Sequence, residues 1–305
     1  MNNQFEQRFQ WVRGFRTKLE VLSENPPTTD FSVPTKGFLS SKLATGARLA
    51  NHIFELASIF GISRQLHRKP AIFIEDSKYN SLLNTVRRVI PGLLDQFQIF
   101  DKPVPREANR VLLSKRCCVF DDPRKYENVT DEYLHLTGNF YQSWKYFDRF
   151  SSEIRNFVKP SSDFSPLPQS NDKNFISCIH IRRTDFVDGQ HHSSDVNFIK
   201  PALDFIKENE KKKGNENKRM LTVIMGDDQK FEEKMYENTV IAKKGAEIKD
   251  NVEYFVSDNS PHDDLAYSRY HCDAVLITGR GGGKNCGGGN NGYGSGVIIG
   301  SARKN

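Results

Sequence analysis

The residues best suited to chemistry stand at the end of one short apolar segment. Residues 175–181 read Phe-Ile-Ser-Cys-Ile-His-Ile, a composition that predicts a buried β-strand. Arg182, Arg183 and Asp185 follow directly. Arginine suits phosphate because its planar guanidinium donates two parallel hydrogen bonds and keeps its charge. The pattern favours a phosphate-bearing ligand at the carboxyl end of the strand, where open α/β sheets bind ligands. Solvated or ion-paired arginines are the alternative interpretation.

A second apolar segment ends in the same way. Residues 220–225 predict another buried strand, and Gly226, Asp227 and Asp228 close it. Asp264 lies further along, in the acidic first turn of a predicted helix, as the helix dipole favours. Polar groups are therefore expected again at the carboxyl end of a strand.

A third segment with possible function precedes an amphipathic helix. Thr45 and Gly46 stand before its first turn, whose free N–H groups can receive an anion, and Arg48 and Asn51 lie near that turn. An amphipathic helix capped by Thr45 is the simpler alternative. The apolar residues that define the helix follow the spacing i, i+4, i+7, i+8 and i+11: Leu49, Ile53, Leu56, Ala57 and Phe60.

The elements that must position these residues alternate in type. From residue 175 onward the order is strand, helix, strand, helix, strand, helix, strand, which predicts a parallel sheet covered by helices. The strands are expected at 175–181, 220–225, 252–256 and 274–278, and the helices at 198–209, 231–236 and 262–271.

The preceding part predicts a second α/β layer. Strands are expected at 71–74, 111–113, 117–120 and 133–137, and helices from Leu49 to about 67, at 81–90 and at 147–158.

Composition divides the chain into four parts. A polar segment and linker occupy 1–35, an N-terminal α/β half 36–165, and a second α/β half, which holds the predicted phosphate-binding residues, 166–278. Residues 279–305 hold 11 of the 21 glycines and almost no residues able to form a core, so disorder is expected there.

Charge and cysteine content exclude several classes of protein. The net charge of +6 suits an anionic ligand without choosing one. The five cysteines are too few and too scattered for a disulfide framework, and their spacing fits no zinc site. Residues 1–22 have no continuous apolar core, so neither a signal peptide nor a membrane anchor is expected there. Nucleic-acid binding is disfavoured because the glycine-rich tail has few arginines and one aromatic residue.

Three segments in order resemble one family. Residues 180–185, His-Ile-Arg-Arg-Thr-Asp, resemble the HxRRxD motif of the α-1,2-fucosyltransferases (glycosyltransferase family 11). Residues 46–57 resemble the GxRLGNQxFxxAx block of that family, and residues 263–278 resemble its late helix–strand segment. Within this family, the chain resembles the divergent nematode branch.

The resemblance implies a GT-B-like fold, with two Rossmann-like halves that face a cleft. It implies an inverting transfer of L-fucose from GDP-fucose to the 2-hydroxyl of a galactose-bearing glycan, with no metal and no cofactor. It further implies protein glycosylation in the Golgi membrane or lumen. The sequence carries no signal about oligomeric state.

The same resemblance suggests roles for individual residues. Without a metal, protein cations and N–H donors must stabilise the GDP leaving group. Arg182 would bind the β-phosphate, with Arg183 assisting it or bracing the loop. Asp185 would orient an arginine or hold the guanine or ribose. The base for the acceptor hydroxyl is open among Asp185, Asp227 and His180.

The expected site therefore has two levels. Arg182 and Asp185 are the predicted catalytic residues. The predicted donor-binding residues are His180, Arg182, Arg183, Asp185, Gly46, Asn51, Asp227 and Asp264, of which Gly46 and Asn51 would line the cleft from the other half. No metal ligand is expected.

The chain departs from the family pattern at two places. Ala50 and His52 stand where the family usually has Gly and Gln. After Thr278 the family continues with a Ser/Thr-x-Phe-x-Trp-Trp segment that helps to build the donor pocket, whereas this chain enters its glycine-rich tail. A non-catalytic protein that binds a GDP-sugar or a glycan is therefore the alternative function.

Overall fold

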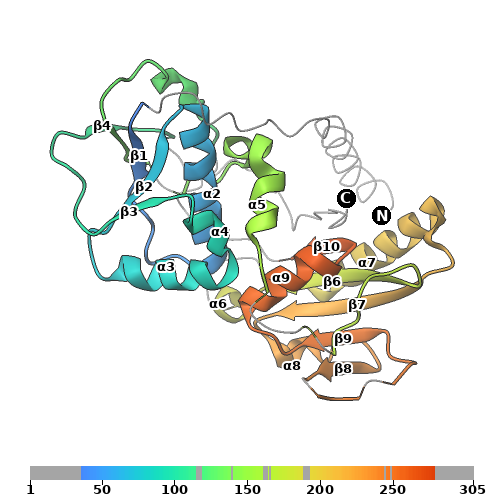
Figure 1. The fold of residues 1–305 in the computed structure, drawn as a ribbon. Helices are drawn as coiled ribbons and strands as arrows, with labels where there is room; N and C mark the ends of the chain where they lie inside the picture. Colours follow the sequence, from blue (N-terminus) through green and yellow to red (C-terminus); the bar gives the residue numbers. More distant parts are fainter. Residues whose placement is uncertain are drawn as a thin grey trace. The chain divides into compact units, whose positions relative to one another are not determined.

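The computed structural model describes residues 36–278, apart from 115–118, 139, 161–163, 165, 188–192, 244 and 248. The described residues divide into two compact units, one up to Lys159 and one from Pro160 (Figure 1). The polar N-terminal segment, the glycine-rich tail and the start of the strand expected at 117–120 lie outside the described residues. The arrangement of two halves around a cleft stays a prediction.

The first unit is built on a five-stranded sheet with the order β3-β2-β1-β5-β4. All of its strand pairs are parallel. The predictions at 71–74 and 133–137 are confirmed, whereas the strand expected at 111–113 lies two residues earlier and the first and third strands were missed. The strands are β1 (Phe38–Ser41), β2 (Lys69–Phe73), β3 (Gln98–Phe100), β4 (Asn109–Val111) and β5 (Tyr133–Leu136).

The helix predicted after Gly46 is α2 (Leu49–Gln65), and it is buried on more than the one predicted face. Its polar residues Glu55, Ser58 and Ser63 are buried together with Leu56 and Phe60. The reason is that α2 lies between its own sheet and the chain around Tyr146. A Cβ on Gly61 would lie 2.2 Å from the Tyr146 carbonyl oxygen, so glycine permits this close approach.

The other helices of the first unit are short. The helix predicted at 147–158 begins later, because its first residues form a 3₁₀ turn at Asp148–Phe150. Two further 3₁₀ turns occupy Pro123–Tyr126 and Trp144–Tyr146. The α-helices are α3 (Lys78–Val89), α4 (Pro91–Leu94) and α5 (Ser151–Phe157).

The second unit contains the predicted parallel sheet, with the order β10-β6-β7-β9-β8. Its edge strand β8 was missed, because Thr239–Ala242 has only four residues and three of them are half-buried. The helix expected at 231–236 begins two residues earlier and ends four residues earlier, as α8 (Gln229–Glu232). The remaining strands are β6 (Asn174–Ile181), β7 (Arg219–Gly226), β9 (Tyr254–Ser257) and β10 (Ala274–Ile277).

Helices flank this sheet, and α7 supplies much of its core (Figure 1). Ile199, Leu203 and Ile206 of α7 are buried against Ile179 and Ile181 of β6. Burying one such side chain contributes about 1.5–3 kcal/mol. The α-helices are α6 (Thr184–Val187), α7 (Val196–Glu210), α8 (Gln229–Glu232) and α9 (Pro261–His271).

A disulfide joins Cys178 in β6 to Cys272 at the end of α9, with the Cα atoms 5.7 Å apart. The sequence predicted no disulfide framework, and this single bridge was missed because a separation of 94 residues carries no spacing signal. The pair forms because β10 adds to the sheet directly beside β6. The bridge therefore fixes the start of β10 against the strand that leads to Arg182.

The described residues contain no helix that is long and apolar enough to cross a membrane.

Candidate functional site

The site begins where β6, β7 and β10 end side by side. Ile181 is the register partner of Gly226, and His180 is the partner of Ile277. Because the strands are parallel, the residues that follow them emerge at the same edge of the sheet. A Cβ on Gly226 would lie 2.4 Å from the Ile181 carbonyl oxygen, so only glycine allows β7 to end so close to β6. This packing brings Arg182 and Asp227 together.

The Arg182 guanidinium lies between two carboxylates. Its Nη2 is 2.7 Å from Asp185 Oδ2, and its Nη1 is 3.1 Å from Asp227 Oδ2. The guanidinium also lies 5.3 Å from the centre of the Phe186 ring, within range of a cation–π contact. The Arg182 side chain remains 26% exposed, so an anion from solvent can reach it.

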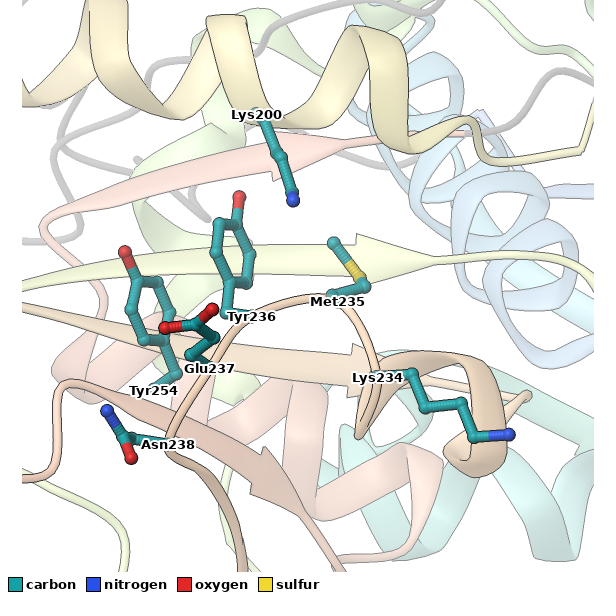
Figure 2. Close-up of a pocket in the computed structure, with 7 residues that line it drawn as sticks. All are labelled: Lys200, Lys234, Met235, Tyr236, Glu237, Asn238 and Tyr254. Carbon is teal, nitrogen blue, oxygen red and sulfur yellow. The ribbon is translucent and has the colours of Figure 1, made fainter.

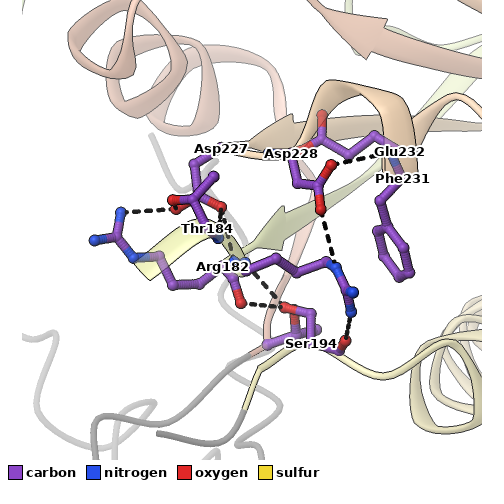
Figure 3. Close-up of polar contacts among 9 residues, drawn as sticks. Arg182, Thr184, Ser194, Asp227, Asp228, Phe231 and Glu232 are labelled. Carbon is purple, nitrogen blue, oxygen red and sulfur yellow. Dashed lines mark hydrogen bonds and ion pairs between the residues drawn. The ribbon is translucent and has the colours of Figure 1, made fainter. Parts of the chain in front are cut away.

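Asp227 is the acceptor that organises the turn after β6 (Figure 3). Its Oδ1 accepts hydrogen bonds from the backbone N–H groups of Arg183, at 2.7 Å, and Thr184, at 3.3 Å. Its Oδ2 accepts from Thr184 Oγ1 at 2.8 Å and pairs with Arg182. Burial opposes ionisation of Asp227, but these hydrogen bonds and the Arg182 charge hold its pKa below the usual range. Asp227 is thus a stable anion whose acceptor positions are all used.

Arg183 points to a different set of partners and braces the surrounding loops. Its Nε donates to Asp228 Oδ2 at 3.1 Å, and its Nη1 donates to the Ser194 carbonyl at 2.8 Å. Its guanidinium carbon lies 3.9 Å from the centre of the Phe231 ring. Asp228 in turn caps α8 by accepting from the Phe231 N–H. Of the two roles considered for Arg183, this geometry fits bracing the loop.

Two hydroxyl groups hold the backbone behind Arg182. Ser194 Oγ accepts a hydrogen bond from the Arg182 N–H at 2.9 Å and is bonded to Thr278 Oγ1. Thr278 Oγ1 donates to the His180 carbonyl at 2.7 Å, while the His180 side chain is exposed. The sequence did not point to Ser194, because a lone serine after a polar loop has no pattern of its own. The end of β10 therefore supports the turn that carries Arg182.

Two carboxyl groups with raised pKa values, the buried Glu232 and the half-buried Asp264, lie near Asp228. Glu232 is 1% exposed and accepts from the Asp228 N–H at 3.2 Å, and burial together with nearby carboxylates raises its pKa to about 7. Asp264 accepts from Ser257 Oγ at 2.6 Å, and its pKa is also raised to about 7, mainly by burial. The structure thus places the predicted residue Asp264 at the end of β9. Glu232, whose pKa Asp264 helps to raise, was not predicted from the sequence.

Gly46 and Asn51 belong to the first unit. Gly46 lies in an exposed turn where an added Cβ would meet no atom within 4 Å. Asn51 Oδ1 accepts from Gln142 Nε2 at 2.7 Å. The N-cap of α2 is Arg48 without a side-chain hydrogen bond, so the alternative in which Thr45 caps the helix is wrong, while anion binding at this turn stays a prediction.

The loop before α2 is held by two residues that the sequence did not single out as a pair. Glu55 Oε2 accepts from the Ala44 N–H at 3.0 Å, and His52 Nε2 lies 3.2 Å from the Ala44 carbonyl. Glu55 Oε1 also accepts from the Phe140 N–H at 3.3 Å. Burial raises the pKa of Glu55 to about 7. One turn of α2 therefore contacts both the N–H and the carbonyl oxygen of Ala44.

A separate pocket of the second unit contains none of the predicted site residues (Figure 2). Its volume is about 560 Å³. Tyr236 and Tyr254 stack with their ring centres 4.2 Å apart, and Lys200 Nζ lies 5.4 Å from the Tyr236 ring. Because the two tyrosine rings stack, each covers the facing side of the other, and less aromatic surface is available to a ligand than the size of the pocket suggests.

The described part of the chain holds no group of three His, Cys, Asp or Glu residues arranged to bind a metal ion. Arg182 and Arg183 follow β6, and they face Asp227 and Asp228, which follow β7. The two guanidinium groups face three carboxylates, Asp185, Asp227 and Asp228, so a phosphate group would bind here by displacing one of these carboxylates from its arginine.

Comparisons with curated proteins identify relatives in Caenorhabditis elegans. A protein named "Putative glycosyltransferase C06E1.7" is 62% identical over 286 residues, which cover 91% of this chain and 78% of that protein. A protein named "Putative galactoside 2-alpha-L-fucosyltransferase svh-11" is 40% identical over 255 residues, which cover 83% of this chain and 68% of that protein. A protein named "Galactoside 2-alpha-L-fucosyltransferase" is 31% identical over 251 residues, 75% of this chain and 62% of that protein. No protein-family model matches the chain.

Proposed function

Because the chain belongs to the galactoside 2-α-L-fucosyltransferase family, we propose that it transfers L-fucose from GDP-fucose to a glycan. The acceptor atom is the 2-hydroxyl of a galactose residue, and the transfer inverts the anomeric carbon. The observation that carries the proposal for this chain is the guanidinium of Arg182. It is fixed at the carboxyl end of β6 and remains accessible to an anion.

Arg182 is proposed to bind the β-phosphate of the donor. Its two carboxylate partners differ in how easily a phosphate can displace them from the guanidinium. Asp227 keeps its three hydrogen bonds to the backbone and hydroxyl of residues 183 and 184 when Arg182 moves away. The Asp185 side chain is 40% exposed and can be solvated instead. A diphosphate can therefore replace Asp185 at the guanidinium without leaving a buried carboxylate unpaired.

Charge develops on the leaving GDP as the glycosidic bond breaks. Arg182 would stabilise that charge through a bidentate contact that strengthens as the phosphate becomes more negative. Arg183 would keep the loop in place through Asp228 and Ser194. The proposal includes catalysis without a metal ion, because the arginine supplies the positive charge.

The acceptor hydroxyl must lose a proton to a general base. Asp227 is poorly suited, because all of its acceptor positions are occupied. Asp185 and His180 are both exposed at the same edge of the sheet. Asp185 contacts the guanidinium that would hold the leaving phosphate, whereas an inverting transfer needs its base on the opposite face of the fucose ring, so the proposal leaves the base open between Asp185 and His180.

The function is tested first by binding. Isothermal titration calorimetry with GDP-fucose and with GDP should give saturable binding to the folded chain. Absence of binding by both ligands would refute the donor assignment. GDP release and fucose incorporation are then measured with N-acetyllactosamine, in EDTA and with added Mg²⁺ or Mn²⁺. Equal rates are expected, and NMR of the product should show the α-linkage at the galactose 2-hydroxyl.

The alternative is a relative that binds a GDP-sugar or a glycan without transfer. Binding of GDP without fucose transfer or donor hydrolysis would favour it. The family membership also leads us to propose a role in protein glycosylation in the Golgi. Co-localisation of the tagged full-length protein with a Golgi marker is expected, and a diffuse cytosolic signal would contradict that placement.

A further inference from the structure

The first unit contains an open pocket of about 330 Å³ that includes none of the predicted site residues. It lies between the chain at 120–124 and the chain at 144–149, beside the last residue of α2. Its lining combines aromatic, acidic, basic and amide side chains: Gln65, Phe120, Asp122, Trp144, Lys145 and Asp148, with Arg124 and Arg149.

Two large aromatic side chains stand exposed in this pocket. Phe120 is 36% exposed and Trp144 is 42% exposed. Exposed aromatic surface that lines a pocket marks a binding site more often than a stray surface residue does. A flat ring presents a face against which the C–H face of a pyranose ring can pack.

The Phe120 side of the aromatic wall is held from behind by the buried Tyr146. The Phe120 ring centre lies 5.1 Å from that of Tyr146. The Tyr146 hydroxyl accepts from the Asp121 N–H at 3.0 Å, and its carbonyl accepts from Gln65 Nε2 at 2.7 Å. A wall fixed in advance loses little conformational entropy when a ligand binds.

The rim supplies hydrogen-bond donors and acceptors of nearly balanced charge. Asp122 accepts from Arg124 Nε at 3.0 Å and from Arg124 Nη2 at 2.5 Å, which fixes both groups as a planar pair. Lys145 Nζ lies 5.4 Å from the centre of the Phe120 ring. Asp148 and Arg149 complete the rim with one charge of each sign. Such a rim suits a neutral ligand rich in hydroxyl groups better than a strongly charged one.

We propose that this pocket binds a neutral saccharide, as a glycan-binding site distinct from the Arg182 site. A sugar ring would pack on Trp144 and Phe120, and its hydroxyl groups would bond with the Asp122–Arg124 pair and Asp148. The choice of a saccharide over other aromatic-binding ligands rests on the proposed function. The site would hold a saccharide without taking part in the reaction.

Tryptophan fluorescence tests the proposal directly, because the chain has two tryptophans, Trp11 and Trp144. In a Trp11→Phe variant, Trp144 is the single reporter. Titration with the neutral oligosaccharide lacto-N-tetraose should give a saturable change in emission. No saturable change at millimolar concentrations would overturn the proposal, as would a larger response to the nucleoside guanosine.

Variants then locate the binding surface. Trp144→Ala and Phe120→Ala should each weaken lacto-N-tetraose binding, measured by saturation-transfer NMR, by about tenfold or more. Leu112→Ala is the matched control, because Leu112 is exposed to a similar degree but does not line the pocket. Unchanged binding in both aromatic variants would refute the site.

GDP-fucose titration of the same variants separates the two proposals. Each variant should bind GDP-fucose as the unaltered chain does. If the aromatic variants lose the saccharide while no form of the protein binds GDP-fucose, the proposed function fails and the saccharide site stands. If GDP-fucose binds but the saccharide does not depend on Trp144, the saccharide site fails alone.

Discussion

Asp227 Oδ2 lies 3.1 Å from Arg182 Nη1, and the same carboxylate receives hydrogen bonds from the next two residues of the chain. One acidic side chain at the end of β7 thus holds both the proposed phosphate-binding guanidinium and the backbone that carries it. Asp227 is therefore a positioning residue for Arg182.

Replacing Asp227 with Asn should weaken GDP binding and lower stability. An amide keeps one acceptor oxygen but turns an NH₂ group toward donors that the carboxylate now satisfies. Loss of these interactions should cost about 1–3 kcal/mol in the free energy of unfolding. Urea denaturation and calorimetry with GDP measure the two effects. Unchanged values for both would show that Asp227 does not position Arg182.

Acid should reproduce part of the Asp227→Asn effect in the unaltered chain. The native pKa of Asp227 is lowered, so its contribution is present above the ordinary aspartate pKa and is lost as pH falls through the native value. GDP binding should therefore persist through mildly acidic pH. The comparison of pH profiles for the unaltered chain and Asp227→Asn checks this, since the variant should lack the acidic loss.

Arg182→Lys should weaken GDP binding by about tenfold or more, because an ammonium cannot make the bidentate contact of a guanidinium. The fold should persist, since the ion pairs of Arg182 lie at a partly exposed edge. Arg88→Lys, at an exposed position of α3, is the matched control. Calorimetry provides the measurement, and an affinity equal to that of the control would remove Arg182 from the phosphate site.

The parallel sheet of the second unit was predictable because its inner strands are short apolar runs bounded by polar turns. The convergence of Arg182 with Asp227 was also accessible, since both follow such strands. Ser194 and Glu232 were not, because their roles depend on contacts across the sheet edge that leave no periodic pattern. The edge strand β8 was not predicted for a related reason: only its last residue, Ala242, is buried.

Glu232 should make stability fall as pH rises. Its native pKa is about 7 against an ordinary value of 4.5, so the native state binds more protons than the unfolded state between these values. The full loss approaches about 3 kcal/mol at alkaline pH. Glu232→Gln should make the fall with pH less steep by the contribution of this one group, because the pKa values of Glu55 and Asp264 are raised to about 7 as well and keep the rest. Glu233→Gln, at an exposed position, should keep the full slope. The free energy of unfolding is measured by urea denaturation between pH 5 and pH 8. The same dependence of this free energy on pH in both variants would contradict the prediction.

The disulfide between Cys178 and Cys272 should be detectable as a cross-linked peptide pair by mass spectrometry without reduction. Cys272→Ser should lower stability by about 4–5 kcal/mol in the chain-entropy account of a loop of this length. Thermal unfolding in the presence and absence of reductant is the measurement. A reductant should lower the melting temperature of the unaltered chain and leave that of Cys272→Ser unchanged.

The contact of Glu55 with the Ala44 N–H predicts a further stability effect in the first unit. Glu55→Ala leaves the partly buried N–H groups of Ala44 and Phe140 without their acceptor, which should cost about 1 kcal/mol each. His52→Gln, the residue usual in the family, should be nearly neutral, because the glutamine amide can still donate to the Ala44 carbonyl. Hydrogen exchange of the Ala44 amide separates the two changes. Faster exchange is expected in Glu55→Ala alone, and equal exchange in all three proteins would show that Glu55 does not hold this loop.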